Sequence, residues 1–153
     1  AGAALTLHER LEPLSFLLGE WRGLGVVGYP SMTESRFEQE LSFTTDGRPF
    51  LTYSSRTWLL DDDGNRLRPS SAESGFWRPG ENERDVEVVL SNPTGIAEVY
   101  DGEVVFRKIE LRTIGIGRTP TAKEVTAVDA QARIQVLASL ATDVVIDVVG
   151  FYR

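Results

Sequence analysis

Turn signals recur about every 8–12 residues after Trp21, and this spacing constrains the fold more than any other feature of the sequence. Residues 61–65 (DDDGN) and 92–95 (NPTG) combine Asp, Asn, Pro and Gly, the residue types that tight turns between strands require. Between the turns apolar and polar residues alternate, as in residues 86–90, which is the period of a strand with one buried face. No helical pattern separates these strands, so the sequence predicts an antiparallel sandwich or barrel.

Only the beginning of the chain has a helical pattern. Thr6 and Glu9 have the spacing of a capping box, in which the two side chains satisfy free amides at a helix start. Leu11, Leu14 and Leu18 share one face at helical spacing. We therefore expect a short helical segment before the first strand.

The order of these elements favours a closed barrel in one domain. A helical lid (residues 1–18) is followed by a barrel (residues 19–153), and closure of a barrel removes the exposed edge strands. The pattern leaves open whether the interior holds a small ligand or is filled by side chains. Strands are expected at residues 38–43, 50–60, 73–78, 86–90, 96–99, 104–106, 109–113, 123–127, 132–137 and 144–149.

Composition excludes several classes of function. The 16 basic and 23 acidic side chains give a net charge of −7, which argues against a nucleic-acid partner. No apolar run approaches the ~20 residues that a membrane-spanning helix needs. The absence of cysteine excludes thiolate metal sites and thiol nucleophiles, and the single histidine, His8, excludes a His-rich metal site. We expect a cytoplasmic protein with no catalytic and no metal-ligating residues.

The most specific local string is GEWRGLG at residues 19–25, where the helical segment meets the first strand. Trp21 is large enough to plug the closed end of a barrel, and its indole N–H would need a partner there. Gly19, Gly23 and Gly25 allow the backbone to bend and other groups to approach it closely.

This string resembles the nitrobindin family, which is similar in architecture to fatty-acid-binding proteins and lipocalins. Other strings agree with the family in order along the chain: residues 14–18 (LSFLL), 48–53 (RPFLTY), 73–78 (ESGFWR) and 121–126 (TAKEVT). The resemblance implies an all-β fold, a ten-stranded antiparallel up-and-down β-barrel with a short N-terminal helical segment capping one end. It also implies an interior pocket.

The resemblance further implies a ferric haem, held by a histidine near the C-terminus, whose iron binds nitric oxide and isomerises peroxynitrite. In this sequence residues 148–153 (VVGFYR) contain no histidine, and residues 70–72 (SSA) stand where relatives carry a second one. Histidine, methionine and tyrosine can each ligate haem iron, and we considered His8, Met32 and Tyr152 as substitutes. His8 is better explained as a surface or packing residue and Met32 as a packing residue, and Tyr152 has little preorganisation near the end of the sequence. We therefore expect no cofactor and no peroxynitrite isomerase activity.

What remains is a binding protein, monomeric or homodimeric, for a small hydrophobic or amphipathic molecule such as a fatty acid. Lys123, Arg133 and Arg56 are candidate inward cations for a carboxylate head, and Thr52 and Trp77 are candidate cavity-lining residues. Outward strand charges and ordinary core packing explain the same five residues equally well. Two alternatives stay open: a haem protein that uses a non-histidine ligand or an unseen C-terminal tail, and an interaction scaffold whose barrel has filled in.

If Trp21 plugs one end of the barrel, replacing it with alanine should be costly. We expect Trp21→Ala to lower the free energy of unfolding by about 3–5 kcal/mol, the usual loss for a buried tryptophan. Chemical denaturation measures this loss, and a value below ~1 kcal/mol would contradict the role assigned to Trp21.

Overall fold

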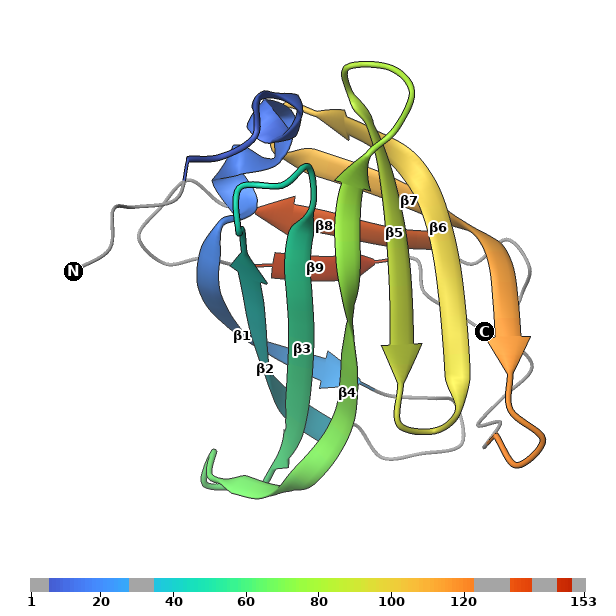
Figure 1. The fold of residues 1–153 in the computed structure, drawn as a ribbon. Coiled ribbons are helices and arrows are strands. Elements are labelled where there is room, and N and C mark those ends of the chain that lie inside the picture. The colour runs from blue at the N-terminus through green and yellow to red at the C-terminus, as the bar shows by residue number, and fades with distance from the viewer. Residues whose placement is uncertain (1–5, 28–34, 123–132, 139–145, 150–153) are drawn as a thin grey trace.

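The computed structural model describes residues 6–27, 35–122, 133–138 and 146–149, and only the backbone of residues 26–27, 35, 133–138 and 146–149. Its one helix is a 3₁₀ helix, η1 (Glu9–Leu17), and an extended β-meander follows it (Figure 1). In this described part of the chain, no helix is long and apolar enough to cross a membrane.

Nine strands form one antiparallel sheet in which each strand pairs with the next along the chain. They are β1 (Gly19–Val27), β2 (Ser35–Thr44), β3 (Leu51–Leu60), β4 (Arg66–Pro79), β5 (Asp85–Asn92), β6 (Ile96–Val105), β7 (Lys108–Arg118), β8 (Arg133–Ala138) and β9 (Ile146–Val149). The sheet curves until β9 comes back to β1 (Figure 1). The all-β, up-and-down architecture expected from the sequence is therefore confirmed.

The described residues give nine strands, of which β1 was not among the ten segments expected from the sequence. The segments 96–99 and 104–106, predicted as two strands, fall in the single strand β6 apart from Phe106, because the chain runs through Gly102 without a turn. Strand β4 begins at Arg66, well before residue 73, since the turn at 61–65 leads directly into pairing with β3. The strand expected at 123–127 lies outside the described residues.

The start of η1 differs from the expected capping box. His8, not Thr6, is the N-cap residue, and its Nδ1 accepts a hydrogen bond from the backbone N–H of Arg10 at 3.1 Å. A ring nitrogen thus takes the place of the hydroxyl that usually satisfies a free amide at a helix start. This hydrogen bond holds His8, the only histidine of the sequence, at the start of η1 and outside the strands.

The helix closes one end of the apolar core. Leu11, Leu14 and Leu17 are buried against the strands, and Trp21 packs on the same core while half-buried itself. The Nε1–H of Trp21 donates to the carbonyl oxygen of Leu17 at 2.6 Å, which confirms that this indole needs and finds a partner. The GEWRGLG string therefore attaches the first strand to the helical cap.

Two glycines let neighbouring strands approach each other more closely than a side chain would permit. A Cβ atom on Gly102 would lie 1.8 Å from the carbonyl oxygen of Glu110, and one on Gly75 would lie 1.8 Å from that of Val89. Such contacts accompany strongly coiled strands, which a closed sheet needs. Gly75 and Gly102 are therefore required by the curvature of the sheet.

Replacing one of these glycines should damage the fold far more than replacing a glycine in open space. We expect Gly102→Ala to lower the free energy of unfolding by about 3 kcal/mol or more, because the backbone must move to admit the methyl group. Gly117→Ala is the matched control, since a Cβ atom there would meet nothing within 4 Å. Urea denaturation of both variants tests this, and equal stabilities would contradict it.

Candidate ligand-binding site

The predicted ligand-binding residues do not come together. Trp77 is 3% exposed and lies in the interior on β4, whereas Thr52 and Arg56 are exposed on β3, where they alternate with buried residues. This outward placement corrects the expectation that Arg56 is an inward cation and that Thr52 lines a cavity. Lys123 lies outside the described residues, and of Arg133 only the backbone, at the start of β8, is described.

Trp77 belongs to an aromatic cluster on the inner faces of three adjacent strands. The ring of Phe43 lies 5.0 Å from that of Tyr53 and 5.3 Å from that of Trp77, and the rings of Tyr53 and Trp77 are 5.7 Å apart. The Nε1–H of Trp77 is buried and has no hydrogen-bond partner among the residues that the structure describes. Buried indole N–H groups normally find an acceptor, so this donor needs an explanation.

Two tyrosines beside this cluster are each bonded to a carboxylate. Tyr53 Oη donates to Glu73 Oε1 at 3.0 Å, and Tyr100 Oη donates to Glu98 Oε2. These four side chains come from β3, β4 and β6, and we call them the carboxylate–phenol wall. The wall gives the interior a polar, acidic side opposite in character to the leucines of η1.

Strand register explains how the wall assembles. Tyr53 stands opposite Gly75 on β4, Gly75 stands opposite Leu90 on β5, and Leu90 stands opposite Glu98 on β6. Gly75 thus leaves a position without a side chain in the row that joins Tyr53 to Glu98. On β4 itself, this position lies between Trp77 and Glu73, which share the inner face because side chains alternate along a strand.

Burial controls the protonation of the wall. It raises the pKa of Glu73 above its ordinary value, the hydrogen bond from Tyr53 lowers this pKa, and the negative charge of Glu98 raises it further. Burial also raises the pKa of Tyr53 well above that of a free phenol, with Glu73 adding to the shift. Burial and then Glu98 do the same for Tyr100. The phenols therefore stay protonated as hydrogen-bond donors to the carboxylates.

A second polar contact extends the wall onto β2. Gln39 Nε2 donates to the hydroxyl of Ser55 at 3.0 Å, and Ser55 is buried directly opposite Glu73 in the register of β3 and β4. The interior is thus lined by polar side chains on several consecutive strands.

Glu73, Glu98 and Tyr100 were not predicted as site residues, although a signal for them is present in the sequence. Glu73 lies two residues before Gly75 and four before Trp77. Glu98 and Tyr100 lie six and four residues before Val104. An even spacing places side chains on one face of a strand. Counting along the strand from a confidently buried residue would therefore have identified all three and would have rejected Thr52 and Arg56.

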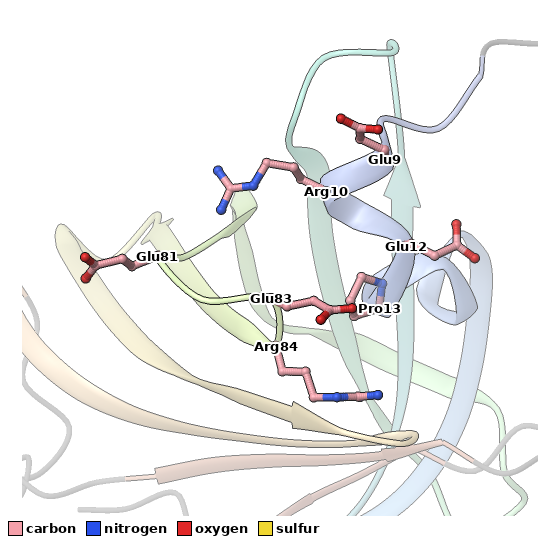
Figure 2. Close-up of a pocket in the computed structure, with 7 residues that line it drawn as sticks. All are labelled: Glu9, Arg10, Glu12, Pro13, Glu81, Glu83 and Arg84. Carbon is pink, nitrogen blue, oxygen red and sulfur yellow. The ribbon is translucent and has the colours of Figure 1, made fainter.

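A separate hollow of ≈ 510 Å³ lies outside the barrel, at the end that η1 covers (Figure 2). The helix and the connection between β4 and β5 line it, with Glu9, Arg10, Glu12 and Pro13 on the helix and Glu81, Glu83 and Arg84 on the connection. Arg10 Nη2 donates to the carbonyl oxygen of Gly80 at 2.5 Å and so joins the two elements. Most of the side chains that line this hollow are charged, and it faces solvent. The hydrogen bond of Arg10 across it holds the helical cap to the connection between β4 and β5.

The pKa of Glu73 gives a prediction for stability against pH. Because folding raises this pKa above the ordinary 4.5, the stabilising contribution of Glu73 is fully present below pH 4.5 and is lost as the pH rises through the raised pKa. Glu73→Gln cannot ionise and keeps an acceptor for Tyr53. We expect its free energy of unfolding to fall less between pH 4.5 and pH 8 than that of the parent protein.

Glu20→Gln is the control, because Glu20 is exposed on β1. Urea denaturation at several pH values compares the three proteins. If Glu73→Gln and Glu20→Gln lose stability equally over this range, Glu73 is not the buried acid described above.

Comparison with known families identifies residues 10–148 as a match to the THAP4-like, heme-binding beta-barrel domain. The match includes η1 and all nine described strands, apart from Glu9 at the start of η1 and Val149 at the end of β9.

Related proteins carry two names. A ferric nitrobindin-like protein of Streptomyces coelicolor is 47% identical over 78% of this chain and 63% of its own length, and one of Streptomyces avermitilis is 48% identical over 76% and 61%. A protein of Streptomyces griseus named peroxynitrite isomerase is 46% identical over 82% of this chain and 68% of its own length. The matches thus span less than two thirds of the first two relatives.

The crystal structure of Rv2717c from Mycobacterium tuberculosis superimposes with a TM-score of 0.67 at 32% identity, over 97% of this chain and 100% of that one. The expectation that no cofactor is involved is wrong at the level of the family, because the matching domain is a heme-binding one. The chain belongs to the nitrobindin family of THAP4-like, heme-binding β-barrel domains.

Proposed function

We propose that the interior of this barrel binds a small hydrophobic or amphipathic molecule in contact with Trp77. The observation that carries the proposal is the buried Nε1–H of Trp77, which no described residue accepts. A buried donor without a partner costs about 1–3 kcal/mol. A ligand with an acceptor atom next to the indole would remove this cost.

The two sides of the interior suit an amphipathic molecule. Binding sites for small molecules combine mostly apolar walls with a few polar groups that fix orientation. Here the buried Phe43, Leu51 and Leu90 offer apolar surface, and the carboxylate–phenol wall offers polar groups beside it. A monomeric or homodimeric state and a cytoplasmic location remain part of this proposal.

Ferric haem is the occupant that the family suggests. The described interior offers it no imidazole, because His8 caps η1 outside the barrel. It does offer the phenols of Tyr53 and Tyr100, and tyrosine is an oxygen ligand for ferric haem in other proteins. Burial and the neighbouring carboxylates raise the pKa of both phenols, which opposes the phenolate form that would ligate iron. Among the described residues, any bond to haem iron would therefore come from a phenol oxygen, against the preference of its surroundings.

When bound, haem would supply an iron centre for peroxynitrite, the substrate that the name of the Streptomyces griseus relative gives. The residues of this chain would contribute orientation through the carboxylate–phenol wall and apolar contact through the aromatic cluster. Tyr152, the substitute ligand considered from the sequence, lies outside the described residues.

Titration with two separate probes, hemin and dodecanoate, tests the proposal. We expect saturable one-to-one binding of at least one probe in calorimetry. A sharp Soret band that shifts with nitric oxide would identify haem as the occupant. Saturation by dodecanoate alone would identify a ligand of the fatty-acid type, and failure of both probes to saturate would overturn the proposal.

Trp77→Phe removes the unpartnered N–H and keeps an aromatic ring. We expect this variant to bind the probe with about fivefold lower affinity, which corresponds to the loss of one hydrogen bond of ~1 kcal/mol. The control is Trp58→Phe, because Trp58 lies on β3 with the guanidinium of Arg66 3.7 Å above its ring. Unchanged affinity in Trp77→Phe would separate Trp77 from the site.

A further inference from the structure

We propose that the outer face of strands β4 to β7 is a contact surface for a second copy of this chain. The four strands are consecutive in the sheet (Figure 1). The proposal concerns the outside of the sheet, so it goes beyond the binding function proposed for the interior and does not depend on it. The surface consists of three rows of outward side chains, each of which crosses all four strands.

The middle row is apolar and exposed, and we call it the outer apolar row. Strand pairing places Phe76 opposite Val89 and Val89 opposite Val99, and Ile114 continues the row beside Gly115, the partner of Val99. These four apolar side chains are between 37% and 57% exposed. A continuous group of exposed apolar side chains marks a contact surface, whereas isolated ones need no explanation.

The aromatic end of this row is held in place without being covered. The ring of Phe50 meets that of Phe76 edge-on, with 5.4 Å between their centroids, and the guanidinium of Arg48 lies 4.8 Å from the ring of Phe50. Phe76 still remains 48% exposed. A side chain that is already held in one position loses little conformational entropy when a partner binds.

A charged row lies on one side of the outer apolar row. It consists of two ion pairs in line across the strands, Arg78 with Glu87 at 3.4 Å and Arg112 with Asp101 at 2.9 Å. Two charges of each sign make this row neutral, although the whole chain has a net charge of −7. Two copies can therefore meet at this face without the local repulsion that an acidic surface would cause.

A row of small residues lies on the other side. Strand pairing aligns its four members across the same strands: Ser74, Ser91, Ala97 and Gly117. All four are exposed. This row is therefore lower than the charged row and leaves space above it for long side chains.

The three rows complement themselves under a two-fold axis that runs along the outer apolar row. Such an axis brings the apolar rows of two copies together and places Val89 opposite the same residue of the second copy. It also places the charged row of each copy over the small row of the other. A two-fold axis along the strands would instead place Arg78 opposite Arg112 and bring like charges together. A two-fold contact of this kind closes at two copies.

The size of the surface indicates a weak dimer. Strands lie about 4.8 Å apart and outward residues about 7 Å apart along a strand, so three rows across four strands cover roughly 20 Å by 20 Å with their side chains. Two copies would bury on the order of 1,000 Å² in total, which is at the low end for specific contacts. We therefore expect a dissociation constant of roughly 100 µM.

Sedimentation velocity of the whole chain between about 5 µM and about 500 µM tests the proposal. We expect monomer at the lowest concentration and mostly dimer at the highest. Val89→Lys brings two positive charges together across the axis, so this variant should stay monomeric throughout. Val105→Lys is the matched control, because Val105 is a similarly exposed valine on β6 outside the three rows. It should associate as the parent chain does.

Mixtures of charged variants test the direction of the axis. Val89→Lys mixed with Val89→Asp should regain association, because the proposed axis places residue 89 opposite itself. Val89→Lys mixed with Val99→Asp should associate more weakly, since these two residues face each other only when the axis runs along the strands. Thermal melting verifies that each variant is folded.

The proposal is overturned if the parent chain stays monomeric at the highest concentration, and the outer apolar row would then belong to contact with a different protein. It is also overturned if Val105→Lys prevents association as fully as Val89→Lys does. Tighter association of the second mixture than of the first would overturn the proposed axis. Titration of these variants with hemin or dodecanoate tests only the function proposed for the interior, so the two proposals can fail separately.

Discussion

The alternation of side chains along an antiparallel strand is the constraint on which the rest of this structure depends. Once the sheet closes, every second residue faces the interior, and a slip of one residue would exchange the two faces of a strand. The turn at 61–65 starts the pairing of β3 with β4: Asp61 Oδ1 accepts from the backbone N–H groups of Asp63 and Asn65 at 2.9 Å, and Gly64 has a φ of 83°. Two register shifts, one between Leu59 and Leu60 and one between Arg56 and Trp58, then set the pairing that brings Tyr53 opposite Gly75. The interior therefore depends on these irregularities as well as on the turn.

The sequence predicts the meander well because its turns are local. Residues 61–65 and 92–95 carry their own chemistry, so the strands on either side could be placed without knowledge of the tertiary structure. Gly102 was harder, since glycine ends some strands and lets others coil, and only the proximity of Glu110 shows which applies. The capping of η1 by His8 was unexpected for a similar reason, because a histidine cap has no strong sequence pattern.

The site was predicted less well than the fold. Trp77 was expected to face the interior and is buried there, whereas the choice of Thr52 and Arg56 rested on residue type and not on strand face. The contacts that define the wall join residues about 20 positions apart, as in Tyr53 and Glu73, and depend on pairing between β3 and β4. Glu73 and Glu98 are partly buried, and carboxylates removed from water cost stability unless they are hydrogen-bonded, so their place beside the core is consistent with a binding role.

The three tryptophans lie in three different surroundings, and this gives the protein an intrinsic optical label. Trp21 is half-buried at the cap, Trp58 lies beneath the guanidinium of Arg66, and Trp77 is buried against the phenol of Tyr53. The emission of an indole depends on the polarity and charge around it. With Trp21 and Trp58 replaced by phenylalanine, the remaining tryptophan fluorescence would come from Trp77 in the interior of the barrel. Ligand binding could then be followed by this fluorescence without an attached dye.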